Sequence, residues 1–280
     1  MRFAFKTSPQ NTTWADMLAV WRAADDIDVF DSGWTFDHFY PIFTDDSSGP
    51  CLEGWVTLTA LAQATTRLRL GVLVTGIHYR HPAVLANMAA TLDIVSGGRL
   101  ELGIGAGWNE VESGAYGIEL GTLTERFDRF DEACEVITSL LTEHTTTFDG
   151  RYFQLTDAYC EPKSVQQPHP PICIGGTGRK RTLPAAARWA QHWNHPGASV
   201  EDWRATYDVL LECCADIGRD PSEITTSTHL RLGPEGPGAV AEQAAAYAEA
   251  GMDLGIVYIP VPHDPAVLEP LAEALAPLTT

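Results

Sequence analysis

The segment RLELGIGAGWNE, from Arg99 to Glu110, has the pattern of a β-strand that ends in glycines. Its first four residues alternate polar and apolar side chains, which is typical of a strand. Glycine then occupies positions 103, 105 and 107, so one face of the strand end carries no side chains. Another group can lie against such bare backbone, and we interpret this strand end as the floor of a cofactor site. A glycine strand with a purely structural role is the alternative interpretation.

The same glycines could instead belong to the dinucleotide fingerprint G-x-G-x-x-G. That motif requires a helix that begins directly on the last glycine. In this chain Gly114, Gly117 and Gly121 follow closely, which argues against a helix at this place. We therefore expect the glycines to serve a different kind of cofactor site.

Short apolar segments alternate with longer helical patterns along the chain, as in repeated βα units around a parallel sheet. Strands are expected at residues 2–8, 29–37, 68–76, from 99, 171–176, 191–195, 224–232 and 252–261. Helices are expected from 13, at 53–65, from 82 to the glycines at 97 and 98, at 124–143, 179–190, from 199, at 239–250 and from 265. Eight such units predict an α/β protein with a (β/α)8 TIM barrel, formed as a single domain over residues 1–280, and a doubly wound sheet is the alternative. The loop at 39–51 and a hairpin at 145–162 would be insertions.

The chain is strongly acidic: 18 Lys and Arg face 37 Asp and Glu, a net charge of −19 among 280 residues. Such a surface argues against nucleic acid and anionic membranes as partners. No apolar run approaches the roughly 18 residues that a membrane-spanning helix needs, and the N-terminus lacks the apolar region of a signal peptide. The six cysteines show no C-x-x-C spacing. We therefore expect a cytoplasmic protein with free thiols and no membrane association.

The carboxyl ends of the strands are where a TIM barrel carries its active site. Asp37 and His38 end the second predicted strand, and histidine suits proton transfer near neutral pH. Asp37 can accept a hydrogen bond from an imidazole ring, so we predict that it steadies His38. The alternative is an ordinary strand-end carboxylate next to a packed histidine. Histidine pairs elsewhere lack a third ligand at metal-binding spacing, so no metal site is expected.

A second group of strand-end residues, Gly175-Gly176-Thr177-Gly178, stands directly before Arg179-Lys180-Arg181. Free backbone N–H groups at a helix start, together with basic side chains, favour a phosphate. The segment is not a Walker A loop, because no Gly-Lys-Ser or Gly-Lys-Thr follows at the required spacing. We predict an anion site here, and a solvated helix start is the alternative.

Taken jointly, several segments resemble the luciferase-like monooxygenase superfamily, and within it the actinobacterial branch of coenzyme F420-dependent oxidoreductases. The matching segments are GWTFDHFYPIF (33–43), CLEGWVTLTALAQAT (51–65), RLRLGVLVTGIHYRHPAVLANMAATLD (67–93), RLELGIGAGWNE (99–110) and EPKSVQQPHPPICIGGTGRKRTL (161–183). The resemblance covers most of the chain to about residue 195.

The resemblance implies a TIM-like barrel with a flavin or deazaflavin across its strand ends, backed by a non-proline cis peptide near Val72–Val74. It also implies that Asp37 and His38 lie beside the reactive edge of the cofactor. Some relatives carry an acidic residue before the Asn-Glu pair, which Glu110 would have to replace here, so sugar-phosphate chemistry is disfavoured. Besides Asp37, cofactor contacts are implied for Val72, Leu73, Thr75, Ala106, Gly107, Asn109, Gly175, Gly176 and Thr177.

The resemblance implies an oxidoreductase that transfers a hydride between coenzyme F420 and a small organic substrate (a carbonyl, imine, activated alkene or alcohol), with His38 as proton donor or acceptor. The alternative is a monooxygenase that uses reduced FMN and oxygen. A cofactor-binding protein without turnover is the third possibility. The resemblance also implies a homodimer.

Overall fold

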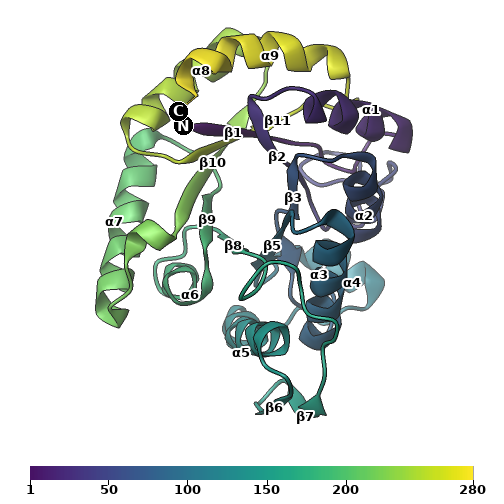
Figure 1. Ribbon diagram of the computed structural model, residues 1–280, viewed down its shortest axis with the longest axis vertical. Helices are drawn as coiled ribbons and strands as arrows, with labels where there is room; N and C mark the ends of the chain where they lie inside the picture. Colours follow the sequence, from purple (N-terminus) through teal and green to yellow (C-terminus); the bar gives the residue numbers. More distant parts are fainter. Residues whose placement is uncertain (280) are drawn as a thin grey trace.

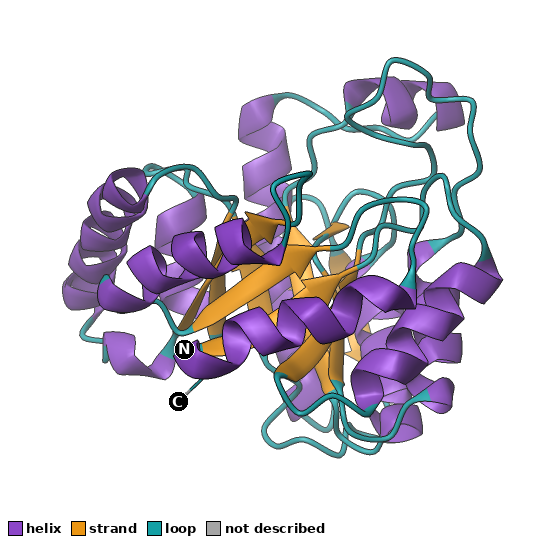
Figure 2. Ribbon diagram, turned by 90° about the horizontal axis from the view of Figure 1, so that it is seen from above, coloured by secondary structure: helices purple, strands orange, loops and turns teal. Residues whose placement is uncertain are grey.

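The computed structural model describes residues 1–279. Within them, parallel strands close into a barrel of eight strand positions with helices around the outside (Figure 1, Figure 2). One position is interrupted, so that β3 and β4 together fill it. The barrel strands are β1 (Arg2–Lys6), β2 (Phe30–Thr35), β3 (Arg69–Val72), β4 (Thr75–Gly76), β5 (Leu100–Gly105), β8 (Ile172–Gly175), β9 (His192–His195), β10 (Thr225–Arg231) and β11 (Leu254–Tyr258). The predicted (β/α)8 barrel is confirmed.

The helices follow the strands in the alternating order that the sequence predicts, and Figure 1 shows them surrounding the strands. They are α1 (Trp14–Asp25), α2 (Gly54–Ala64), α3 (Pro82–Ser96), α4 (Glu110–Tyr116), α5 (Leu123–Thr142), α6 (Thr182–Trp189), α7 (Val200–Ile217), α8 (Pro237–Glu249) and α9 (Leu268–Leu275). Short 3-10 turns add η1 (Pro221–Glu223), η2 (Pro265–Val267) and η3 (Ala276–Leu278).

Local signals in the sequence account for several helix ends. α5 begins with a capping box, in which Thr122 and Glu125 each accept a hydrogen bond from the other's backbone N–H. α3 ends at Gly97, whose φ of 70° is a conformation that glycine adopts without strain. The helix predicted at 179–190 is shorter than expected, because residues 179–181 form a turn before α6.

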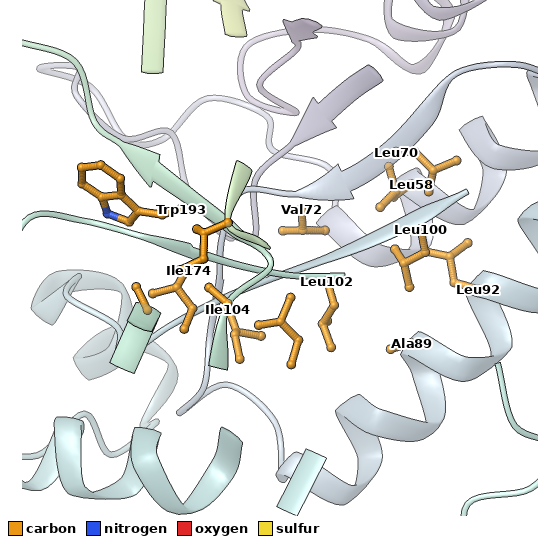
Figure 3. Packing of buried hydrophobic residues seen from close by; sticks show 14 of the residues in the cluster. Leu58, Leu70, Val72, Ala89, Leu92, Leu100, Leu102, Ile104, Ile174 and Trp193 are labelled. Atoms are coloured by element: carbon orange, nitrogen blue, oxygen red, sulfur yellow. The ribbon is translucent and has the colours of Figure 1, made fainter. Parts of the chain in front are cut away.

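The main hydrophobic core lies between the barrel strands and the helices. Figure 3 shows Leu102 and Ile104 of β5 on the side of the strand that faces Ala89 of α3. Side chains alternate along a strand, so Glu101 and Gly103 point into the barrel instead. Burial of the apolar face therefore fixes which face of β5 is available to the interior.

The alternating glycines of β5 make room for the neighbouring chain. A Cβ atom on Gly103 would lie 1.8 Å from the carbonyl oxygen of Val72, and one on Gly105 would lie 2.9 Å from a methyl group of Val74. The Leu73–Val74 peptide bond is cis, at the place that the family resemblance implies. The predicted floor is thus corrected: the bulge between β3 and β4, and not a ligand, lies against Gly103 and Gly105.

Replacing Gly103 by alanine is expected to destabilise the protein by about 1–3 kcal/mol or more, because the added methyl group must displace the Val72 carbonyl. Gly114→Ala is the matched control, since nothing lies within 4 Å of its added Cβ and it stands inside α4. Alanine in a helix interior is expected to raise stability by about 0.5–1 kcal/mol. Urea unfolding measures both variants, and wild-type stability of Gly103→Ala would contradict this account of the bulge.

A short helix, α4, occupies the region in which the glycine spacing argued against one. Asn109 caps it by accepting a hydrogen bond from the backbone N–H of Glu112. The helix ends at Gly117, whose φ is 68°. One of the glycines that argued against a helix is therefore its C-cap. The expectation was wrong because an asparagine cap and an acidic first turn outweigh the low helix propensity of Gly114.

The two predicted insertions are present. β6 (Thr146–Asp149) and β7 (Gln154–Ala158) pair antiparallel, which confirms the hairpin, and Figure 1 shows it projecting beyond α5. Residues 39–51 form the long connection between β2 and α2, with turns and a single isolated bridge from Gln10 to Cys51.

Two expectations from composition concern cysteines and membranes. The six cysteines are free thiols, as predicted. Across residues 1–279, no helix combines the length and the apolar character needed to cross a membrane.

Candidate active site

A cavity of about 710 Å³ opens at the carboxyl ends of the barrel strands. His38, Gly107 and Gly176, which are far apart in the sequence, all line it. Other walls come from the ends of β1, β10 and β11 and from the β3–β4 bulge. The volume lies within the usual range of small-molecule sites, about 300–1,000 Å³. The predicted convergence of strand ends on one site is confirmed.

His38 is held by a carboxylate from α4. Its Nδ1 lies 2.8 Å from Oε2 of Glu112, whose side chain is fully buried. Because an ionised carboxylate only accepts hydrogen bonds, Nδ1 carries the proton. Nε2 of His38 has no hydrogen-bond partner within residues 1–279, and the ring lines the cavity. This nitrogen is therefore placed to give or take a proton.

Glu112 is the centre of this arrangement. It accepts hydrogen bonds from His38, from the backbone N–H groups of Phe39 and Tyr40, and from the Tyr79 hydroxyl. Burial alone raises the pKa of Glu112, but these hydrogen bonds outweigh it and hold the pKa below its usual value. An ionised Glu112 thus fixes both the imidazole and the start of the 39–51 loop.

Asp37 binds a different partner from the one predicted. Its carboxylate oxygens accept hydrogen bonds from Arg80 at 2.5 and 3.0 Å, and the side chain is fully buried. Arg80 also pairs with Glu53 at 2.6 Å. The prediction that Asp37 steadies His38 is therefore wrong, and Glu112 does so instead. Asp37 and His38 both lie just beyond β2, which ends at Thr35 rather than at Asp37 as predicted. Phe36 and His38 line the cavity and Asp37 does not, as expected where successive side chains point to opposite sides.

The remaining residues predicted to contact a cofactor divide into two groups. Leu73, Gly107, Gly175 and Gly176 line the cavity, whereas Val72, Thr75, Ala106, Asn109 and Thr177 do not. In the second group, Thr75 accepts a hydrogen bond from the Trp55 indole, Asn109 caps α4, and Val72 packs in the core. Backbone glycines and the bulge therefore make this part of the cavity wall.

At the predicted anion site after β8 the backbone N–H donors are available, but Arg181, one of the three expected cations, is not. Arg181 pairs with Asp128 at 2.6 Å and with Asp131 at 3.2 Å, so its charge is already compensated. The backbone N–H groups of residues 177–180 donate to no acceptor within residues 1–279. They follow Gly176 at the cavity wall, where such groups suit a phosphate.

Trp108 stands at the rim of the cavity. Its ring stacks on Phe43 with centroids 5.6 Å apart and meets His38 edge-on at 5.4 Å. Trp108 is 51% exposed and Phe43 is 86% exposed. The aromatic pair therefore borders the mouth beside His38 and leaves the cavity open.

Sequence reasoning missed several residues at the site: Lys6, Tyr79, Glu112, Asn194, His229 and Tyr258. The spacing from Asn109 to Glu112 is a helix-start signal that could have identified the acid. In RFAFK, the lysine alternates with phenylalanines that face the helices. The sequence pattern could therefore have predicted that Lys6 faces the barrel interior.

Comparison with known proteins places this site in a family. Residues 1–276 match the family model described as luciferase-like monooxygenase. An uncharacterized protein of Mycobacterium tuberculosis is 34% identical over 176 residues, which cover 63% of this chain and 61% of that protein. The F420-dependent glucose-6-phosphate dehydrogenase of Microbacterium testaceum is 34% identical over 193 residues, 68% of this chain and 54% of that protein. The chain thus spans 54–61% of the length of these curated relatives.

A solved structure shares the fold over the full length. It is an F420-dependent secondary alcohol dehydrogenase in complex with an F420–acetone adduct, with a TM-score of 0.87, 20% identity, and coverage of 100% of this chain and 99% of that one. The family-model match includes the strand ends that carry His38, Gly107 and Gly176. On the strength of that match, the chain belongs to the luciferase-like monooxygenase family.

Proposed function

We propose that this protein is an oxidoreductase that transfers a hydride between coenzyme F420 and a small organic substrate. A carbonyl, imine or activated alkene would accept the hydride, or an alcohol would donate it. The observation that carries the proposal is the His38–Glu112 pair on the wall of the strand-end cavity. The choice of F420 is supported by the relative from Microbacterium testaceum and by the structural neighbour, both of which are named as F420-dependent.

The residues of the cavity fit a phosphorylated tricyclic cofactor. The bulge supplies the apolar side chains of Leu73 and Val74, against which a flat ring can lie. A Cβ on Gly175 would meet a methyl group of Val74 at 3.5 Å, an ordinary van der Waals contact, so this glycine keeps the wall free of side-chain atoms without being required by a clash. The free backbone N–H groups after Gly176 suit the phosphate. When bound, such a cofactor would supply the hydride for a reduction or accept it in an oxidation, and the protein supplies orientation and gives or takes the proton.

His38 is the residue that we propose as the proton donor or acceptor. Reduction of a carbonyl requires a proton at the substrate oxygen, and oxidation of an alcohol requires its removal from the same atom. Nε2 of His38 can serve in both directions, because Glu112 occupies Nδ1 and keeps the ring in one orientation. Trp108 borders the mouth of the cavity beside this ring.

Fluorescence titration of the purified protein with F420 and with FMN tests the choice of cofactor. We expect tighter binding of F420, and oxidation of reduced F420 when carbonyl or imine compounds are added. Tight FMN binding without F420 binding would instead favour the monooxygenase. Binding of F420 without hydride transfer to or from any of the four substrate classes would favour a carrier without turnover.

The variant Gly175→Val tests whether F420 binds against the cavity wall that Gly175 forms. The backbone accommodates the new Cβ, and the valine methyl groups extend toward the cavity that Gly175 lines. We expect weaker F420 binding with little change in melting temperature. Gly238→Ala, in α8 and away from the cavity, is the control that should leave F420 affinity unchanged. Wild-type affinity of Gly175→Val would place the cofactor elsewhere.

A further inference from the structure

The charges around the cavity differ in sign from those of the chain as a whole. The protein carries a net charge of −19, yet none of the described residues that line the cavity is Asp or Glu. Two cations, Lys6 and Arg231, line it on the same side. A cavity wall with only positive charge attracts an anion and disfavours a cation.

These cations come from adjacent strands at one level of the barrel. β1, β11 and β10 are consecutive neighbours in the sheet. Lys6 pairs in register with Tyr258, and Tyr258 pairs in register with Arg231. The three residues therefore form one row across the strand ends, and the row begins on β1, the direct neighbour of β2, whose end precedes His38.

Lys6 is buried without a carboxylate partner. The residue is 3% exposed, and its Nζ donates to the carbonyl oxygen of Leu73 at 2.8 Å and to the Tyr258 hydroxyl at 3.0 Å. An ammonium group has three N–H donors, so one remains for a ligand. Lysine is almost never buried in proteins unless its charge is paired. The missing counter-charge therefore points to a ligand.

Among the described residues, Arg231 also lacks a counter-charge, although it is exposed at the end of β10, unlike the buried Lys6. The Arg231 guanidinium lies 5.2 Å from the Tyr258 ring and has neither an ion pair nor a hydrogen bond within residues 1–279. The buried Nε2 of His229 is also without a partner there. Burial and the two nearby cations hold the pKa of His229 well below its usual value, so this histidine is neutral and adds no third positive charge to the row.

We propose that Lys6 and Arg231 bind an anionic group, a carboxylate or a phosphate, of the organic substrate. This inference rests on the proposed function, because it assigns to the substrate the part of the cavity that lies away from the phosphate-binding backbone after Gly176. Strand β9 lies between β8, which carries that backbone, and β10, which carries Arg231. The substrate would then reach from the cation row toward His38.

Two rival explanations are open to test. Lys6 could serve only to support the bulge through its hydrogen bond to Leu73. Arg231 has no such contact, so a structural role of Lys6 predicts no effect of Arg231 on ligand binding. Alternatively, both cations could bind a charged part of the cofactor, in which case an anionic ligand would compete with the cofactor.

The experiment uses F420-loaded protein, or FMN-loaded protein if only FMN binds, and calorimetric titration. The probes are phenylacetate, its uncharged analogue phenylacetamide, and phenyl phosphate. Hydrogen bonds to charged groups are the stronger ones, so we expect phenylacetate to bind about 10–100-fold more tightly than phenylacetamide. The phosphate probe shows which of the two anions the row prefers. Equal affinity of the charged and uncharged probes would overturn the inference.

Variants of the two cations test whether Lys6 and Arg231 cause the preference for phenylacetate over phenylacetamide. Arg231→Gln and Lys6→Met should each weaken phenylacetate binding by about tenfold or more and leave phenylacetamide unchanged. Lys6→Arg should retain part of the preference. Arg2→Gln is the matched control, because Arg2 is also in β1 but pairs with Asp31 outside the cavity. A Lys6 effect without an Arg231 effect, or competition between phenylacetate and the cofactor, would each overturn the inference.

The titration needs no turnover, so its outcome is separate from that of the proposed function. A preference for the carboxylate in protein that never transfers hydride would reject the oxidoreductase and keep the anion site. Hydride transfer without any preference for the charged probe would reject the anion site alone.

Discussion

Replacing His38 by alanine is expected to lower the turnover number by about 10²–10⁴-fold, the usual contribution of a positioned acid or base. Nε2 is free at the cavity, and Nδ1 is fixed 2.8 Å from a buried carboxylate. Alanine removes both the proton carrier and the contact that orients it. The dissociation constant for F420 should change little, because the bulge and the glycine walls remain. Steady-state oxidation of reduced F420 and fluorescence titration measure the two quantities.

His144→Ala is the control for His38→Ala. His144 is exposed near the hairpin and lies outside the cavity, so its loss should leave both quantities unchanged. Turnover of His38→Ala at the wild-type rate would remove His38 from proton transfer. A large loss of F420 affinity with unchanged turnover at saturation would assign the residue to binding.

The barrel and its strand-end cavity could be predicted because both follow from local patterns. The alternation of βα units fixes the topology, and the topology brings His38, Gly107 and Gly176 to one rim. The order of residues along a strand also predicts which side chains face the interior. None of these inferences requires knowledge of which residues, far apart in the sequence, contact each other.

The partners of the site residues could not be predicted in the same way. His38 meets Glu112 rather than its neighbour Asp37, and that contact depends on how α4 packs over the loop after β2. The glycines at 103 and 105 signal a close approach of some group. The pattern cannot distinguish a cofactor from the Val72 carbonyl, since both require the same missing side chain.

Glu101→Gln has the largest expected effect on stability. The Glu101 carboxylate lies 2.8 Å from Nδ1 of His192 and 2.9 Å from Nε of Arg69 inside the barrel. Nε2 of His192 donates to Ser227, which also accepts from Asn194 at the cavity wall. Removing one partner of a buried ion pair leaves an uncompensated charge and typically costs about 3–5 kcal/mol.

The size of this effect should depend on pH. Burial alone lowers the pKa of His192, but the Cys173 sulfur and the Glu101 carboxylate raise it from 6.5 to about 10. Burial alone raises the pKa of Glu101, but His192 and Arg69 lower it from 4.5 to about 2. The histidine contribution is complete below pH 6.5 and is lost as the pH rises through 10. The glutamate contribution is complete above pH 4.5 and is lost as the pH falls through 2.

Both contributions are therefore present together between about pH 4.5 and 6.5, and the difference between wild type and Glu101→Gln should be largest there. Urea unfolding across the pH range measures it. Glu110→Gln is the matched control, because Glu110 is 80% exposed and its loss should change stability by less than about 0.5 kcal/mol. A difference that stays constant up to pH 10 would show that His192 is neutral in the folded protein. The contact with Glu101 would then be an ordinary hydrogen bond, and its loss would cost about 1 kcal/mol.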